Sequence, residues 1–216
     1  SLIGQIIPGV TTAVFSYKLK RQERNILKFI RLCHEKHKEF DERLSRLEKE
    51  QLNQFSRCFG LVVDYVFDEP QEKKIDYMVN GLLGLSEHED VKEDFVLHYY
   101  DVLKNLRIVD IDVLIYYYNS TQSTHVMEKH NLSFEQFNSV RLKLERNGLL
   151  KTRFDDQLED LYENMINLQT FIEQAAKGKG GRLKRLNKLN KRDSFSISRF
   201  GRDFIEFFVK DNVEEL

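Results

Sequence analysis

Residues 133–154 read SFEQFNSVRLKLERNGLLKTRF, and this stretch contains the signals of a helix followed by a strand. Ser133 is followed three residues later by Gln136, which is the spacing of a capping box that opens a helix. Gly148 stands where the end of a helix commonly needs a residue in the left-handed conformation. We therefore predict a helix over residues 134–147, with a short strand directly after it.

The neighbouring segments complete an informative order of elements. Asp110 can cap a helix, residues 120–124 form a polar break, and a short helix spans residues 125–130. The alternating stretch 194–198 can pair with the strand predicted over 149–154. Helix, short helix, longer helix, strand, strand and helix is the order of a winged helix-turn-helix domain, which this part of the chain resembles.

The end of the chain supports the same resemblance. Residues 197–205 read ISRFGRDFI, similar to the strand-then-helix ending of many bacterial winged-helix proteins, in which Ser or Thr precedes a Gly-Arg pair. The chain departs from that family because 39 residues, 155–193, separate the two strands, whereas a compact wing takes only several. Apolar residues recur at helical spacing from Leu158 to Ile172, so we expect a helix inserted in the wing.

The earlier part of the chain is predicted to be helical, because 2 Pro and 10 Gly in 216 residues leave few forced stops. Residues 21–67 follow a seam with alternating steps of four and three, typical of a helical hairpin or bundle, or of a dimeric coiled coil. The seam comprises Ile26, Ile30, Cys33, His37, Phe40, Leu44, Leu47 and Gln51. We predict a mainly α fold that comprises an apolar start and coiled-coil-like arm (1–69), a helical connector (70–106) and a winged-helix-like domain (107–216).

Residues 1–17 carry no charged side chain and place apolar residues on one helical stripe. The stretch is shorter than the roughly 20 apolar residues of a membrane span, and it lacks the positive start of a signal peptide. We expect it to mediate packing or oligomer contact, or else to contact a membrane surface.

The charges balance overall but are segregated along the chain. Against 34 Lys+Arg stand 35 Asp+Glu, yet residues 177–192 carry eight basic and no acidic side chains, while residues 71–176 carry 11 basic and 19 acidic ones. Near neutrality argues against general coating of nucleic acid, while the local positive field can attract phosphate or an acidic partner. Two cysteines, Cys33 and Cys58, are too few for a secreted disulfide scaffold and favour a cytoplasmic setting.

The basic segment 177–192 lies between the two predicted wing strands, which would bring it to a DNA backbone if the helix 134–147 entered the major groove. The candidate residues for binding double-stranded DNA are Gln136, Asn138, Ser139, Arg141, Lys143, Arg146, Lys184, Arg185, Lys188, Lys191 and Arg192. Alternatively, leucines at every third position give the segment an apolar side that docks on an acidic protein surface.

No motif for catalysis or cofactor binding is present. The glycine-rich KGKGGR at 177–182 lacks the Gly-Lys-Ser/Thr of a phosphate-binding loop. Cys33 and His37 lie four residues apart and could chelate a metal, but their place on the apolar seam explains them, and no second ligand pair has a recognised spacing. We predict a non-enzymatic protein with no catalytic residue, metal or cofactor.

The whole layout resembles bacterial proteins of prophages and mobile elements, including Abi-alpha-like abortive-infection proteins. The shared features are the apolar start with Pro8-Gly9, the charged helical arm, the linking helices and the ending Phe200–Phe204. The resemblance implies phage defence or exclusion as the context. We predict a regulatory or interaction protein that binds DNA or a protein through its winged-helix-like unit and self-associates through 21–67. The alternative is a membrane-associated abortive-infection or exclusion effector that senses a phage protein.

Overall fold

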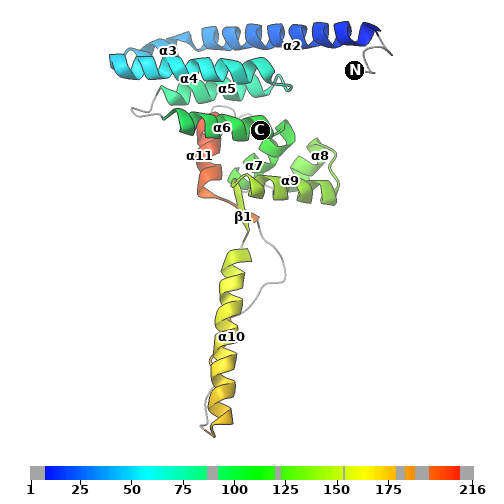
Figure 1. Cartoon of the computed structure of the whole chain (residues 1–216), viewed down its shortest axis with the longest axis vertical. Helices are drawn as coiled ribbons and strands as arrows, with labels where there is room; N and C mark the ends of the chain where they lie inside the picture. Colours follow the sequence, from blue (N-terminus) through cyan, green and yellow to red (C-terminus); the bar gives the residue numbers. More distant parts are fainter. Residues whose placement is uncertain are drawn as a thin grey trace.

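The computed structural model describes residues 8–86, 92–119, 123–152, 154–178, 183–187 and 195–209, and it is mainly helical, as predicted (Figure 1). Its helices are α2 (Pro8–Glu35), α3 (His37–Leu44), α4 (Lys49–Asp68), α5 (Lys74–Leu85), α6 (Glu93–Asn105), α7 (Ile108–Asn119), α8 (Ser123–Lys129), α9 (Phe134–Arg146), α10 (Phe154–Ala176) and α11 (Arg199–Phe208). Two strands, β1 (Leu150–Thr152) and β2 (Phe195–Ile197), pair antiparallel. Nowhere in these ranges does a helix reach the length and apolar character needed to cross a bilayer.

The predicted arm is a hairpin and not one extended helix. After α3 the chain turns at Glu48, whose extended backbone opens α4 with a capping box, and its N–H donates to Gln51 Oε1 at 2.7 Å. α4 then returns along α2, where Asn25 Nδ2 donates to the carbonyl oxygens of Val66 and Glu69 at 3.0 and 2.8 Å. Of the two arrangements that the sequence left open, the structure has the hairpin.

The buried face of α2 differs from the predicted seam. Gln22, Asn25 and Phe29 are buried, whereas Ile30 is 57% exposed and His37 is also exposed. The predicted seam is the pattern of a helix with one partner. α2 packs on both α4 and α5, so its covered face is turned toward the groove between these two helices.

α5 lies at the centre of the core. Ile75, Met78 and Leu82 are fully buried, and α5 packs against α2, α4 and α11. The approach of α11 is close, because a Cβ on Gly81 would collide with the ring of Phe208. Buried apolar residues of α2 to α9, the strands and α11 form one cluster. The division of the chain at residues 69 and 106 stays a prediction.

The order of elements predicted for the last hundred residues is observed. α7, α8, α9, β1, α10, β2 and α11 follow one another, and the register pairs Leu150 with Ile197 and Thr152 with Phe195. Ser198 caps α11 by accepting the Gly201 N–H at 2.8 Å. The helix expected inside the hairpin is also present: α10 extends away from the other helices, at the bottom of the view (Figure 1).

Candidate nucleic-acid interface

α9 is held at its start by the predicted capping box. Ser133 Oγ accepts the Gln136 N–H at 3.3 Å, and the Ser133 N–H donates to Gln136 Oε1 at 2.8 Å. Phe137 and Leu144 are buried and fix one face of the helix on the core. The backbone N–H of Glu135 and the Ser133 hydroxyl lower the pKa of the Glu135 carboxyl, so a negative charge persists at the start of this helix.

The end of α9 is tied to the hairpin and to α11. Gly148 has a φ of 72°, the left-handed conformation that its position predicts. Ser198 Oγ donates to the Gly148 carbonyl oxygen at 2.6 Å, and the Ser198 N–H donates to the Leu149 carbonyl oxygen at 3.0 Å. Gly201 is required here because a Cβ would collide with that same Leu149 oxygen. The face of α9 opposite Phe137 and Leu144 is therefore held in a fixed orientation at both ends of the helix.

Two of the candidate residues on α9 are engaged within the chain. The Arg141 guanidinium lies over the rings of Phe137 and Phe195, at 5.2 and 4.6 Å from their centroids, and it donates to Asn138 Oδ1. Lys143 forms an ion pair with Asp110, whose side chain is 3% exposed. Both cations therefore stabilise the packing of α9 on α7 and β2.

The remaining candidates on α9 lie at the surface. Gln136, Ser139 and Arg146 are exposed and Asn138 is half-buried, although the Gln136 side chain is used in the capping box. The same helix exposes apolar side chains, because Phe134 is 61% and Leu142 is 48% exposed. The exposed face of α9 thus carries hydrogen-bonding groups, one cation and two large apolar side chains.

The described part of the basic segment lies along α10 and not beside α9. Asn187 pairs with Asn164, its N–H donating to Asn164 Oδ1 at 2.7 Å, while Asn164 Nδ2 donates to the Asn187 carbonyl oxygen at 2.9 Å. Lys184 and Arg185 are exposed on this strand-like return. Lys188, Lys191 and Arg192 lie outside the described residues. The structure therefore does not bring Lys184 and Arg185 together with the candidates of α9.

Two exposed cations near the end of α9 were missed by the sequence analysis. Lys151 is on the exposed face of β1, and Arg199 directly follows the serine that bonds to the Gly148 carbonyl. With Arg146 they lie on the three segments that meet at the end of α9, and all three are exposed. Alternation in the strand Leu150–Thr152 could have identified Lys151, since Leu150 is buried.

A buried carboxylate of α7 connects this helix to the end of α8. Asp112 accepts from Lys129 Nζ at 3.0 Å and lies 2.6 Å from His130 Nε2, which fixes the end of α8. The pKa of the neighbouring Tyr117 is raised by burial, an effect that a hydrogen bond and the charge of Arg141 partly oppose. These contacts lie within the chain, and the outer face of α9 stays exposed at Gln136, Ser139 and Arg146.

The cysteine–histidine cluster of α2 and α3 shows no metal-binding geometry. The His34 and His37 rings stack with their centroids 5.4 Å apart, and His37 Nδ1 lies 2.7 Å from the His34 carbonyl oxygen. Burial raises the pKa of the Cys33 thiol to about 11, which disfavours the thiolate that a metal requires. Across the described ranges, no group of three or more His, Cys, Asp or Glu is placed to hold a metal ion.

Comparison of the chain with protein-family models, with curated protein sequences and with solved structures found no match.

Proposed function

We propose that the chain is a non-enzymatic regulatory protein that binds duplex DNA, with α9 as the helix that enters the major groove. The order of elements from α7 to α11, which resembles a winged helix-turn-helix domain, supports this proposal. The observation that carries it is the exposure of three cations, Arg146, Lys151 and Arg199, on the segments that meet at the end of a helix whose inner face is buried. The phage-defence context rests on resemblance of layout alone and stays a prediction.

The expected chemistry follows from the two kinds of group at this surface. Ser139 and Asn138 can bond to base edges or phosphates, while the three cations neutralise phosphate charge. Each phosphate contact contributes a slope of about −0.9 in the dependence of log affinity on log salt concentration. Loss of the three cations should therefore flatten this slope by roughly three units and weaken binding at low salt.

Fluorescence anisotropy with a short duplex tests the proposal. We expect the variant R146A/K151A/R199A to bind more weakly and with a flatter salt dependence than the parent chain. The matched control K38A/K49A/K92A removes the same charge from exposed lysines on α3, α4 and the start of α6, and it should bind like the parent. Equal affinity and slope for all three proteins would exclude DNA binding through this surface.

The basic segment requires a longer duplex, because Lys184 and Arg185 lie along α10. A helix of 23 residues is about 34 Å long, which matches about ten base pairs of DNA. We expect K184A/R185A/K188A/K191A/R192A to weaken binding to a duplex extended by that length while leaving binding to the short duplex unchanged. The same affinity as the parent on both duplexes would remove this segment from the DNA-binding surface.

A second candidate function, membrane-surface association of an abortive-infection or exclusion effector, is favoured by the start of α2. Tyr17 is 68% and Leu19 is 63% exposed, beside the basic Lys18 and Lys20. In Figure 1 this end of α2 extends beyond the helices below it. An apolar and basic helix end of this kind suits the interface of an anionic membrane.

Flotation with anionic and neutral vesicles tests this second function. We expect the parent chain to float with anionic vesicles and Y17S/L19S to stay behind. The control L52S/F67S changes two other exposed apolar residues, both on α4, and should float like the parent. A parent chain that stays behind with both kinds of vesicle would exclude membrane association.

A further inference from the structure

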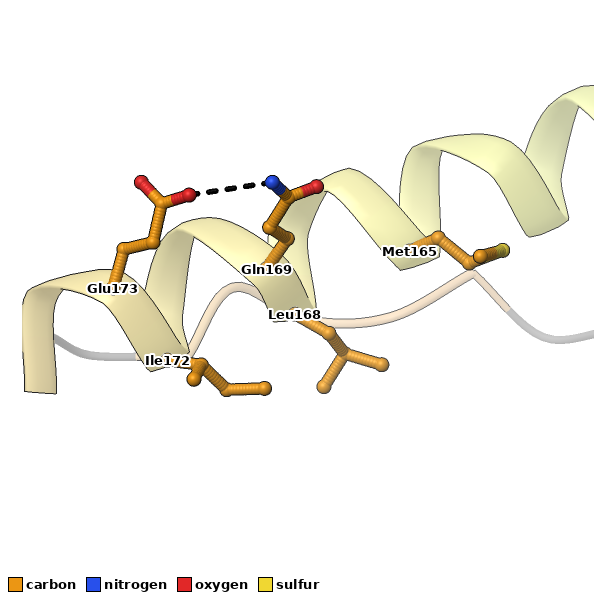
Figure 2. A pocket seen from close by; sticks show the side chains of 5 residues that line it. All are labelled: Met165, Leu168, Gln169, Ile172 and Glu173. Atoms are coloured by element: carbon orange, nitrogen blue, oxygen red, sulfur yellow. Dashed lines mark hydrogen bonds between the residues drawn. The ribbon is translucent and has the colours of Figure 1, made fainter. Parts of the chain in front are cut away.

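α10 exposes an unusual number of large apolar side chains for a helix that extends away from the core. We define the α10 stripe as Leu158, Leu161, Tyr162, Met165, Leu168 and Ile172, whose exposed fractions range from 38% to 67%. Figure 2 shows Leu168 and Ile172 projecting from one side of the helix, while the hydrogen-bonded Gln169 and Glu173 project from another. Soluble monomers rarely expose a contiguous apolar patch of this size.

The spacing of the stripe is that of a coiled-coil seam. Its members at 158, 161, 165, 168 and 172, followed by Ala175, alternate in steps of three and four residues. This repeat favours packing against another long helix, because each residue then enters a hole on the facing helix. The flanking positions Gln157, Gln169 and Phe171 are uncharged, so they do not repel a partner helix.

The chain covers a different face of α10 and leaves the stripe open. Asn164 is only 7% exposed because residues 183–187 run along it. Asn187 Nδ2 also donates to Asp160 Oδ1 at 2.8 Å and to Glu163 Oε2 at 3.1 Å. The polar face is thus occupied by the chain itself, whereas the side chains of the α10 stripe stay 38–67% exposed.

We propose that the α10 stripe binds the α10 stripe of a second copy of this chain, with the two helices antiparallel. The area supports a second copy as the occupant. At roughly 200 Å² for a fully exposed large side chain, the exposed fractions leave on the order of 650 Å² open on each helix. A stable interface buries about 800 Å² per partner, so this helix supplies most of what a dimer needs.

The distribution of charge selects the antiparallel orientation. Residues 155–163 of α10 include five acidic and no basic residues, whereas Lys177 directly follows the end of the helix. A parallel pair would place the two acidic halves level with each other. An antiparallel pair, with Met165 opposite Leu168 of the second copy, places Asp156 level with Lys177 of that copy. This pairing is two-fold symmetric, as most homodimer interfaces are.

The oligomeric state of the full chain tests the proposal. We expect a dimer by sedimentation equilibrium, with M165E/I172E raising the dissociation constant about tenfold or more, because each change buries a charge in the seam. The matched control L27E/I30E places the same charges on exposed apolar residues of α2 and should leave the dimer unchanged. Circular dichroism checks that both variants keep the helix content of the parent.

Cross-linking tests the orientation. In the antiparallel pair Leu161 faces Ile172 of the second copy, while the two Leu161 positions are about 16 Å apart along the helix. A mixture of L161C and I172C should therefore cross-link above the background of the parent chain, and L161C alone should not.

Three results would overturn the proposal. These are a parent chain that is monomeric, a dimer that M165E/I172E leaves intact while L27E/I30E dissociates it, and cross-linking of L161C alone, which would mean a parallel pair. DNA affinity is not measured in these experiments, so their outcome is independent of the proposed DNA binding.

Discussion

α5 and α10 carry similar apolar residues and end in opposite environments. Ile75, Met78 and Leu82 of α5 are fully buried, whereas Met165 and Ile172 of α10 are 61% and 63% exposed. α5 is covered by α2, α4 and α11, while α10 is contacted on its polar side by residues 183–187. A helical apolar face therefore predicts burial but does not say whether the same chain supplies the covering surface.

We expect the free energy of unfolding to differ most between the two regions when one apolar side chain is truncated in each. Phe208→Ala should lower the free energy of unfolding by about 3–5 kcal/mol, because it removes a fully buried ring between α5 and α6. Ile172→Ala, measured where the chain is monomeric, should change it by less than about 0.5 kcal/mol. Urea denaturation measures both. Similar losses would show that α10 is covered within its own chain.

Each region also contains one buried asparagine, and truncating it tests whether that region contributes to global stability. Asn25→Ala should cost about 1–3 kcal/mol, because the carbonyl oxygens of Val66 and Glu69 lose a buried donor. Asn164→Ala should leave global unfolding nearly unchanged and instead increase hydrogen exchange in residues 183–187, which it releases from α10. A loss of global stability in the second variant would contradict this separation.

Tyrosines of the packed region make its stability sensitive to high pH. Burial first, and then the charges of Asp112 and Asp76, raise the pKa of Tyr77 to about 12, while burial raises that of Tyr100 well above its usual value. The folded chain therefore keeps protons that the unfolded chain releases above about pH 10. This stabilisation is complete below pH 10 and is lost as the pH rises toward about 12.

Tyr77→Phe should remove part of that pH dependence. Between pH 9 and about pH 11.5, we expect the variant to lose about 1–2 kcal/mol less of its free energy of unfolding than the parent, after allowance for solvent screening. Denaturation at several pH values provides the measurement. Parallel curves for the parent and the variant would assign the alkaline loss to other groups.

The smallest of the destabilising effects is expected at the start of α9. Ser133→Ala should cost about 1 kcal/mol, because the Gln136 N–H loses its acceptor at the start of the helix. The control Ser45→Ala, at the exposed end of α3, should cost less than about 0.5 kcal/mol. Thermal melting of both variants measures the difference, and equal costs would show that the capping box contributes little.

Local signals predicted much of the fold. Ser133, Gln136 and Gly148 specify α9 through hydrogen bonds and a backbone conformation that depend on adjacent residues only. The turn at Glu48 has a local signal of the same kind, since Gln51 follows three residues later, and the continuous seam from 21 to 67 obscured it. The packing of α11 on α5 could not be predicted, because it depends on the shapes of two surfaces far apart in the sequence.

The candidate interface was predicted less completely than the fold. Helical periodicity placed Ser139 and Arg146 at the surface, as observed. Periodicity could not show that the Arg141 guanidinium packs on aromatic rings within the chain. One of these rings belongs to Phe195, which follows the inserted helix α10 in the sequence. Nor could composition locate Lys184 along α10, since its position follows from the hydrogen bonds of Asn187 with residues 160–164 of that helix.

The docking of α11 on α5 also has a consequence for how the chain is made. Asn80 donates to the carbonyl oxygen of Phe208, 128 residues later, so the centre of the core stays uncovered until α11 has left the ribosome. At about 5–20 residues per second, the ribosome needs roughly 6–25 s to supply that covering helix. During this interval the side of α5 at Gly81 and Gly84, which Phe208 and Phe207 later cover, is open to water.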